Sequence, residues 1–341
     1  MARGALGLMV VASLAITSCS SDDKGSDATT TTAASGSSTT GGSATTGGTD
    51  AGGDWDGKID ALTYNVAGLP EILSGSDPEV NTDLIGPKLN DFDLVLMQET
   101  WETPDPNPLA PTRVYFEILA GHSTHKYKAE MAPQPLGTLA IRPEALLADG
   151  LGLFSNYPIG KTTRVAWTGC FGGADTNDKG AADCLAMKGF SMTRVTIADG
   201  REVDVYDLHG EAGSNPKDQA LQAQDYPQLA AFIAKNSVGR AVIVGGDTNL
   251  HTDADPKNPQ DKPDTKIWQD FLDAAGLTDA CDANDCADPG RIDKFAFRSG
   301  QGVDLGALTY KVETERFKKD DGEQLSDHEA VSVTFGWRAA S

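Results

Sequence analysis

Short apolar segments recur along most of the chain, and this recurrence constrains the fold more than any other feature of the sequence. Some segments are fully apolar and others alternate between apolar and polar residues, and both patterns are typical of β-strands. We predict strands over residues 59–65, 94–98, 136–141, 152–155, 189–197, 201–208, 241–244, 292–297 and 330–335, and helices over residues 83–89, 218–235 and 268–275. Because strands outnumber helices, we expect a layered α/β sandwich with sheets inside and helices outside.

The N-terminus has the pattern of an export signal rather than of a folded element. A short basic start is followed by an apolar run over residues 5–16 and then by the small residues Thr17 and Ser18. Residues 14–19 resemble a bacterial lipobox, in which the cysteine, here Cys19, becomes the lipidated first residue of the mature chain. We therefore interpret residues 1–18 as a lipoprotein signal peptide. Ordinary signal cleavage beside an incidental Cys19 is the alternative.

Residues 19–54 consist almost entirely of Ser, Thr, Gly, Ala and Asp. A segment of this composition lacks the apolar side chains that would offset its ordering entropy, so we expect a disordered tether. We expect residues 55–341 to form the working domain. Such a tether would join this domain to a lipid anchor, which predicts an exported protein, either a bacterial cell-envelope lipoprotein or an extracellular one.

Four cysteines remain after Cys19 is assigned to the lipid, namely Cys170, Cys184, Cys281 and Cys286. An even number in an exported protein suggests two disulfides. Of the three possible pairings we favour the local one, Cys170 with Cys184 and Cys281 with Cys286. Metal binding is the alternative for these residues, although neither spacing matches a zinc module.

The net charge of the chain is −22, from 28 Lys and Arg against 50 Asp and Glu. This charge argues against a protein that holds nucleic acid by bulk attraction, because nucleic-acid binders usually present a basic surface. It leaves open a nuclease whose metal ion supplies the local positive charge. The sequence contains neither a Gly-x-Ser-x-Gly motif nor a P-loop motif, which removes support for a serine hydrolase and for an NTPase.

Polar and charged residues gather where the predicted strands end. Each has an ordinary structural explanation when taken alone, such as a turn or a solvated side chain. As a set they indicate a site, because loops on a rigid scaffold usually carry function and two of the five histidines lie here beside carboxylates. The residues are Asn65, Glu99, His209, Asp247, Asn249, Asp327 and His328.

Together with Asp293 in Arg-Ile-Asp-Lys-Phe, this ordered set resembles the endonuclease/exonuclease/phosphatase superfamily. The Gly-Asp-x-Asn segment that ends at Asn249 and the late Ser-Asp-His segment that ends at His328 are the most specific parts of the match, which extends over nearly all of residues 59–335. The resemblance implies a DNase I-like, four-layered α/β sandwich of two packed mixed sheets flanked by helices. It also implies a metal-dependent phosphodiesterase.

Within that superfamily the chain is most similar to bacterial secreted sphingomyelinases. Three stretches carry this similarity: residues 152–159, the segment from Gly169-Cys170 through Asp175, Asn177 and Asp178 to Lys188-Gly189-Phe190, and Leu-His-Gly-Glu-Ala around His209. One feature departs from the pattern. Those enzymes carry an aromatic-rich hairpin before Ser-Asp-His that docks on membranes, whereas residues 311–325 of this chain are mostly charged.

The resemblance implies a divalent metal ion, Mg²⁺ or alternatively Mn²⁺ or Ca²⁺. Glu99 is the best single ligand candidate, because its hard carboxylate oxygen suits these cations. Asn65 would support the metal or donate to a phosphate oxygen through its amide. Asp327 would lie near the metal or near His328.

The resemblance also implies hydrolysis by a general base without a covalent nucleophile. His328 would take a proton from water, and His209 would stabilise the developing negative charge from the opposite side. Asp247 would orient the attacking water, and Asn249 would form a hydrogen bond with the phosphate. Asp293 would position His209, although the aspartates of the set remain able to exchange roles.

Three functions compete at this point. The first is hydrolysis of a phospholipid head group, the second a nuclease or phosphatase activity, and the third a non-catalytic binding role. The intact set of polar residues disfavours the third. The acidic surface repels DNA, whereas sphingomyelin and phosphatidylcholine are zwitterionic, so we favour a phospholipid substrate over nucleic acid. We expect a monomer held at the membrane by its lipid anchor.

Overall fold

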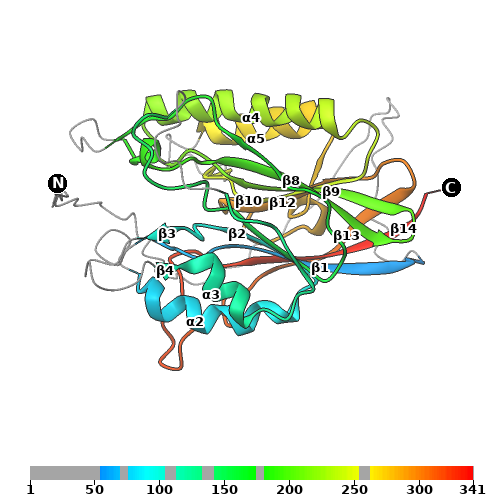
Figure 1. Cartoon of the computed structure of the whole chain (residues 1–341). Coiled ribbons are helices and arrows are strands. Elements are labelled where there is room, and N and C mark those ends of the chain that lie inside the picture. Colours follow the sequence, from blue (N-terminus) through cyan, green and yellow to red (C-terminus); the bar gives the residue numbers. More distant parts are fainter. Residues whose placement is uncertain are drawn as a thin grey trace, which may run out of the picture. The chain divides into compact units, whose positions relative to one another are not determined.

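Two six-stranded sheets pack face to face in the computed structural model (Figure 1). The structure describes residues 54–69, 76–103, 113–132, 142–173, 180–252 and 262–340. The proposed signal peptide and all but the last residue of the proposed tether lie outside these residues. So do the strand predicted over residues 136–141 and the three residues Asp175, Asn177 and Asp178.

The first sheet has the strand order β13-β14-β1-β2-β6-β5. Its strands are β1 (Gly57–Asn65), β2 (Leu94–Gln98), β5 (Tyr127–Lys128), β6 (Gly152–Ser155), β13 (Val303–Val312) and β14 (Val331–Ala339). The neighbours β1 and β2 are parallel, and every other pair in this sheet is antiparallel. The sheet is therefore mixed, with its parallel pair at the centre.

The second sheet has the order β11-β12-β10-β9-β8-β7 and repeats this plan. Its strands are β7 (Thr163–Ala166), β8 (Gly189–Ala198), β9 (Arg201–His209), β10 (Val242–Asp247), β11 (Thr278–Asp279) and β12 (Asp293–Arg298). Only β9 and β10 are parallel within it. A separate ribbon pairs β3 (Glu102–Thr103) with β4 (Arg113–Val114).

Helices cover the outer faces of both sheets (Figure 1). They are α2 (Pro78–Lys88) and α3 (Tyr115–His122) on the first sheet, and α4 (Pro216–Asn236) and α5 (Lys262–Ala275) on the second. Three apolar clusters fill the three interfaces between layers. Phe295 and Phe335 belong to the cluster between the sheets, Leu229 to the cluster under α4 and α5, and Leu119 to the cluster under α2 and α3. The predicted four-layered sandwich is confirmed.

α4 begins at a reciprocal cap. The Asn215 side chain accepts hydrogen bonds from the backbone N–H groups of Lys217 and Asp218, and the Asp218 carboxylate accepts one from the backbone N–H of Asn215. Pro216 occupies the first turn, where its missing N–H would have no helical partner in any case. Because α4 follows the loop after β9, this cap fixes where that loop ends.

The observed elements differ from the predicted ones in several places. α2 begins at Pro78 rather than at residue 83, and α3, β7 and β13 have no counterpart among the predictions. β13 alternates in burial as a strand should, but a glycine inside a strand weakens the strand signal. Here the ring of Trp55 packs against Gly306 and takes the space that a side chain would fill.

The structure contains both predicted disulfides. Cys170 is paired with Cys184, and Cys281 with Cys286, with Cα–Cα distances of 5.2 and 5.0 Å. The first disulfide closes a loop beside β7 and the second a short turn after β11. The local pairing favoured by the sequence is therefore the one that the fold brings together.

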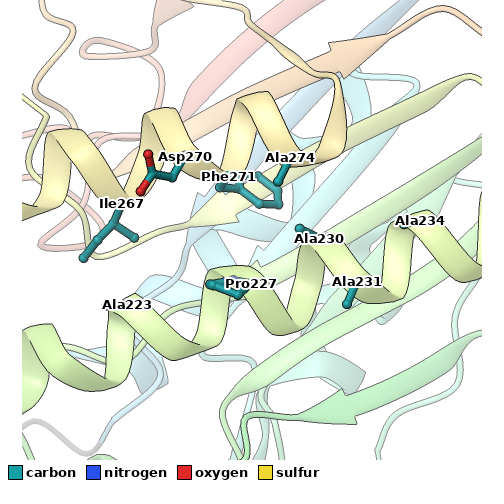
Figure 2. A pocket seen from close by; sticks show the side chains of 9 residues that line it. All are labelled: Ala223, Pro227, Ala230, Ala231, Ala234, Ile267, Asp270, Phe271 and Ala274. Atoms are coloured by element: carbon teal, nitrogen blue, oxygen red, sulfur yellow. The ribbon is translucent and has the colours of Figure 1, made fainter.

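A shallow apolar groove of about 460 Å³ runs between α4 and α5 on the outside of the second sheet (Figure 2). Its lining residues are Ala223, Pro227, Ala230, Ala231, Ala234, Ile267, Asp270, Phe271 and Ala274. None of the predicted site residues is among them. None of the helices in the described part of the chain is long and apolar enough to cross a membrane.

Candidate active site

The candidate site lies where strands of both sheets end side by side. In the second sheet Asp247, the last residue of β10, is in register with His209 on β9 and with Asp293 on β12. In the first sheet Asn65 ends β1, and Glu99 follows directly after β2. Because β1 with β2 and β9 with β10 are parallel, their carboxyl ends reach one edge of each sheet, which is where functional side chains commonly lie.

The backbone at these strand ends adopts unusual conformations. Gly246 has a φ of +151°, and a Cβ there would lie 2.1 Å from the carbonyl oxygen of Leu208, so only glycine fits between β10 and β9. Glu99 and Asn249 have φ values of +60° and +52°, in the left-handed region that non-glycine residues seldom occupy. Such conformations cluster at functional sites, where the surrounding structure fixes them.

The side-chain amide of Asn65 connects the two sheets at this site. Its Nδ2 donates to Glu99 Oε1 at 3.1 Å and to Asp247 Oδ2 at 3.0 Å, while its Oδ1 accepts from the backbone N–H of Ala67 at 3.0 Å. Asn65 is only 1% exposed. It therefore acts here as a buried donor that holds two carboxylates from different sheets near one another.

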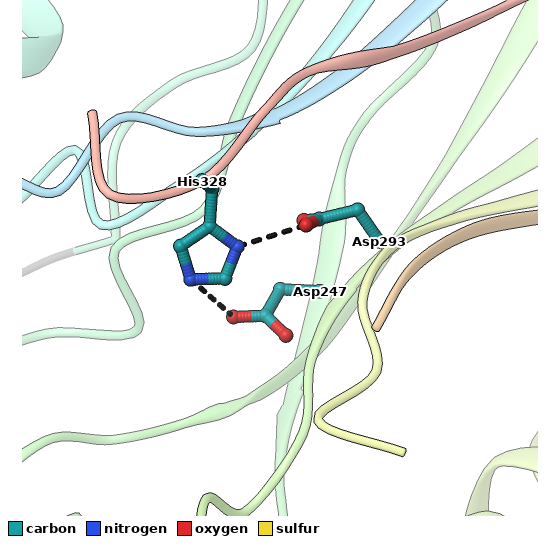
Figure 3. A group of neighbouring side chains, drawn as sticks. All are labelled: Asp247, Asp293 and His328. Carbon is teal, nitrogen blue, oxygen red and sulfur yellow. Dashed lines mark hydrogen bonds and ion pairs between the residues drawn. The ribbon is translucent and has the colours of Figure 1, made fainter. Parts of the chain in front are cut away.

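His328 is oriented by Asp293. Its Nδ1 lies 2.8 Å from Asp293 Oδ2, and its Nε2 faces Asp247 Oδ2 at 3.8 Å (Figure 3). This contact corrects the prediction that Asp293 positions His209. The strand order explains the difference, because β10 lies between β9 and β12 and so separates His209 from Asp293.

Ser326 fastens the loop that carries His328 to the end of β1. Its hydroxyl donates to the carbonyl oxygen of Asn65 at 2.7 Å and accepts from the backbone N–H of His328 at 3.1 Å. The same residue thus ties the last site loop to the first strand of the domain. Asp327, between these two residues, is exposed, and its Oδ1 lies 3.4 Å from the Ser326 hydroxyl.

His209 faces the same carboxylate oxygen of Asp247 as His328 does. Its Nε2 lies 3.4 Å from Asp247 Oδ2 and 3.9 Å from Glu99 Oε1. The ring of Trp101 stacks on the imidazole with centroids 6.0 Å apart, and the Trp101 Nε1–H donates to the carbonyl of Ala148. The imidazole is buried, and its Nδ1 has no hydrogen-bond partner among the described residues.

The surroundings of the two histidines shift their pKa values in opposite directions. Burial lowers the pKa of His209 well below its ordinary value, and the positive charges of Lys188 and His328 lower it further. Burial also acts to lower the pKa of His328, but the carboxylates of Asp293 and Asp247 outweigh burial and raise that pKa well above its ordinary value. His209 is thus set up as a neutral donor and His328 as the more basic imidazole.

The donor set suits a divalent metal ion. Burial raises the pKa of Glu99 to about 7, and the negative charge of Asp327 adds to this rise against the lowering effect of the Asn65 hydrogen bond. A hard cation relieves such crowding of carboxylates. Ligand-type atoms of Asp247, Asp293 and His328 also lie within 4.8 Å of one another. Asn65 turns its amide nitrogen toward the carboxylates, so a direct ligand role for its oxygen stays a prediction.

Asn249 stabilises the loops around the site. Its Nδ2 donates to the carbonyl of Gly210 at 3.1 Å, and its backbone N–H donates to Asp247 Oδ1 at 3.0 Å. Its own carbonyl accepts from Gln222 on α4. The predicted hydrogen bond from Asn249 to a phosphate therefore stays a prediction, because this amide nitrogen already serves the turn after His209.

Two further residues of the site were not recognised as functional in the sequence. Trp101 follows Glu99 by two residues, and an aromatic residue close to a strand-end carboxylate is the only signal for it. Lys188 appears in the sequence only within a stretch similar to sphingomyelinases. In the structure it is buried, and its Nζ lies 2.6 Å from Asp183 Oδ1 while its charge lowers the pKa of Glu99.

Behind His209 the structure buries a cluster of five charged side chains. Arg142 pairs with Glu211 at 2.5 Å, and Lys188 pairs with Asp183. Asp225 on α4 is the fifth member, and neither of its carboxylate oxygens has a hydrogen-bond partner among the described residues. The cluster thus contains three acidic groups and two basic ones. Burying an ionised carboxylate without a partner costs free energy, so Asp225 keeps its proton over an unusually wide pH range.

The family assignment rests on the comparison with known families. Residues 62–328 match the Endonuclease/Exonuclease/phosphatase family, and the chain belongs to this family. A sphingomyelinase of Mycobacterium tuberculosis is 32% identical to this chain over 302 residues, which are 83% of this chain and 54% of the relative. The chain thus spans about half the length of the curated relatives it matches. The expected resemblance to sphingomyelinases is confirmed.

Solved structures agree on the fold. Sphingomyelinase C from Streptomyces griseocarneus superposes with a TM-score of 0.54 at 16% identity, covering 84% of this chain and 100% of that protein. A variant of beta toxin from Staphylococcus aureus, solved with bound magnesium ions, superposes with a TM-score of 0.54 at 16% identity, covering 81% of this chain and 99% of that protein. At these identities the likeness establishes the DNase I-like sandwich.

Substituting Glu99 with Gln tests the metal site. The amide keeps the shape of the side chain but removes the negative charge that attracts a hard cation, so we expect the Mg²⁺ dissociation constant to rise at least about tenfold. Isothermal titration calorimetry with Mg²⁺ measures this constant directly. The matched control is Glu117→Gln on the exposed face of α3, which should leave it unchanged. Equal Mg²⁺ affinity in the wild type and the Glu99 variant would show that Glu99 is not a ligand of the metal ion.

Substituting Asp225 with Asn tests the buried charge cluster. Burial, and after it the charge of Glu211, raise the pKa of Asp225 from 3.8 to about 8, so the folded state holds a proton that the unfolded state releases. The wild type therefore loses stability as pH rises from about 4 to 8, and the variant lacks this contribution. Urea denaturation at pH 5, 6.5 and 8 should show the variant gaining stability relative to the wild type with rising pH.

The exposed Asp273→Asn substitution on α5 is the control for this series. It changes the same chemical group without burial, so its free energy of unfolding should follow that of the wild type at all three pH values. A constant difference between the wild type and the Asp225 variant across the series would mean that Asp225 is already ionised at pH 5.

Proposed function

We propose that the chain is an exported, lipid-anchored phosphodiesterase that depends on a divalent metal ion and hydrolyses the head group of sphingomyelin or a similar zwitterionic phospholipid. The observation that carries this proposal is the placement of two histidines with oppositely shifted pKa values beside one oxygen of Asp247, with Nε2–Oδ2 distances of 3.4 and 3.8 Å. Family membership and the 32% identity to a mycobacterial sphingomyelinase support the reaction class and the substrate class.

His328 acts as the general base in this proposal. Asp293 accepts the Nδ1–H, so Nε2, which lies 3.5 Å from the Asn65 amide nitrogen, is the nitrogen that takes a proton from the attacking water. The carboxylate then stabilises the imidazolium that forms, as in other histidine–carboxylate pairs. Asp247 faces the same Nε2 and is placed to orient the water.

His209 acts from the opposite side. Its buried, neutral imidazole donates from Nε2 toward the oxygen that gains negative charge as the phosphodiester breaks. Trp101 covers one face of the ring and keeps water away from it. The reaction needs no covalent nucleophile, which agrees with cysteines that are held in disulfides.

Glu99 and Asp327 would hold Mg²⁺, or alternatively Mn²⁺ or Ca²⁺, with Asn65 supporting them as a hydrogen-bond donor. Such a cation neutralises the phosphate oxygens and the leaving oxygen. The Asn65 amide keeps Glu99 and Asp247 at hydrogen-bonding distance from a single nitrogen. Lys188 contributes a buried positive charge on the same side as His209.

The side chains of the loop before Ser326 favour attachment to the membrane through the lipid anchor rather than through this loop. Phe317, the only aromatic residue of this loop, is buried with its ring 4.4 Å from that of Tyr64. The loop's basic residues Lys318 and Lys319 pair with acidic neighbours. Because this loop presents no exposed aromatic side chain, we infer that the tether and a lipid on Cys19 bring the site to the membrane instead.

Two assays, one of phospholipid hydrolysis and one of plasmid nicking, test the proposed function. The purified full chain is incubated with sphingomyelin or phosphatidylcholine vesicles, with Mg²⁺ or with EDTA, beside a plasmid-nicking assay. We expect phosphocholine release that needs Mg²⁺ and no nicking. Nicking without phosphocholine release would instead support a nuclease. Activity in neither assay would contradict the proposal.

The His328→Ala variant tests the base. A general base contributes about 10²- to 10⁴-fold to the rate, so we expect kcat for phosphocholine release to fall by this factor while the melting temperature stays close to that of the wild type. The control is His122→Ala on α3, which removes a surface histidine paired with Asp83 and should leave kcat unchanged. Wild-type turnover by His328→Ala would remove this base from the mechanism.

The Cys19→Ser variant tests the anchor. A lipid on Cys19 would hold the protein in the membrane fraction of a bacterial host, and serine cannot carry it. We expect the wild type to sediment with membranes and the variant to appear in the soluble fraction with unchanged activity on detergent-dispersed sphingomyelin. Equal fractionation of both proteins would show that Cys19 carries no lipid and that cleavage follows the ordinary signal-peptide route.

A further inference from the structure

Arg142 is a buried arginine whose guanidinium contacts three other segments of the chain. Its Nη1 donates to the carbonyls of Asp183 at 3.1 Å and Ala186 at 2.7 Å. Its Nη2 donates to the carbonyl of Gly169 and to the carboxylate of Glu211, both at 2.5 Å. A guanidinium presents its donors in a fixed planar fork, so these four acceptors are held in one geometry.

The backbone acceptors belong to the loop that carries the first disulfide. Gly169 directly precedes Cys170, and Asp183 directly precedes Cys184. Irregular backbone that is buried needs side-chain partners for its carbonyl groups, and Arg142 supplies them here. The guanidinium and the disulfide therefore fasten the same loop.

The turn after His209 is attached to this loop at two successive residues. Glu211 is bound by Arg142 through its carboxylate, and its carbonyl accepts from Gln222 on α4 at 2.8 Å. The backbone N–H of Ala212 donates to Asp183 Oδ2 at 2.8 Å. The position of the turn thus depends on the arrangement that Arg142 holds.

His209 depends on this support more than His328 does. A histidine at a functional site is commonly oriented by a hydrogen bond on its second ring nitrogen, and His328 has such a bond to Asp293. The Nδ1 of His209 has no partner among the described residues. Its orientation therefore comes from its backbone, from the stack against Trp101 and from the contacts of Nε2 with Asp247 and Glu99.

We propose that Arg142, through its ion pair with Glu211, is a positioning residue that sets the orientation of His209. The inference rests on the role that the proposed function gives to His209 and deepens it. Arg142 forms no hydrogen bond with a side chain placed in the chemistry, so its positioning effect passes through the turn at residues 209–212, in addition to the effect of its charge, which lowers the pKa of His209.

The test replaces both members of the ion pair, Arg142→Met with Glu211→Met. Removing one partner would leave a buried charge unpaired, whereas two apolar side chains of similar volume keep the fold. Because Met cannot donate to the three backbone carbonyls that Arg142 binds, we expect a folded variant with a lowered melting temperature, and a fall in kcat on sphingomyelin vesicles of about 10- to 100-fold with little change in KM. The affinity for Mg²⁺ should not change, because Glu99 follows a strand of the other sheet.

A second readout follows His209 directly. The protein has five histidines, and the imidazole NMR signal that is missing in His209→Gln identifies the one of interest. We expect this signal to shift in the double variant and the signal of His328 to stay. If the wild type does not hydrolyse sphingomyelin, the proposed function fails, but a shifted His209 signal still supports the positioning role and an unshifted one contradicts it.

Arg298→Met is the matched control. Arg298, at the far end of β12, also donates to three backbone carbonyls, those of Ser237, Arg240 and Ala275. Its loss should lower the melting temperature without moving the His209 signal or kcat. Wild-type kcat and an unshifted His209 signal in the folded double variant would overturn the proposal.

If the double variant does not fold, Glu211→Gln replaces it. This variant keeps an acceptor for Arg142 but removes the charge. A smaller shift of the His209 signal, with kcat lowered in parallel, would support the positioning role, and an unchanged signal with unchanged kcat would contradict it.

Discussion

The hydrogen bonds from the Asn65 amide to Glu99 and Asp247 are the contacts on which the rest of the candidate site depends. The two carboxylates end strands of different sheets, and without a donor between them they would face each other as buried like charges. By holding both, Asn65 fixes where the edges of the sheets meet. The backbone carbonyl of Asn65 also accepts a hydrogen bond from the Ser326 hydroxyl, and this bond holds the loop that carries His328 in place.

The two histidines beside Asp247 are held by different means, and their different properties follow from this. His328 is partly exposed and hydrogen-bonded to a carboxylate, so its pKa rises. His209 is buried, stacked on Trp101 and close to positive charges, so its pKa falls. Environments that move the pKa values of two similar groups apart are a recurring way to assign one of them to accept a proton and the other to donate a hydrogen bond.

Stability and function are separated in this fold. Three apolar clusters between the layers contain most of the buried hydrophobic residues, while a cluster of buried charged residues lies behind the end of β9. Burial of the ion pairs of Arg142 with Glu211 and of Lys188 with Asp183 removes water from four charged groups. This desolvation costs free energy that apolar residues at the same positions would not cost. Both pairs lie close to His209, which agrees with a role in arranging the site.

The sequence by itself predicted most of the longer strands, favoured the local disulfide pairing and singled out most residues of the candidate site, because apolar periodicity and polar strand ends are local signals. It did not determine that Asp293 forms a hydrogen bond with His328 rather than with His209, since the partner of Asp293 depends on the order β12-β10-β9 across the sheet. β13 and α3 also escaped prediction, and Gly306 in β13 is accommodated only by the packing of the distant Trp55. Arg142, Lys188 and Trp101 gained their places only in the tertiary structure, because burial and charge pairing join residues that are far apart in the chain.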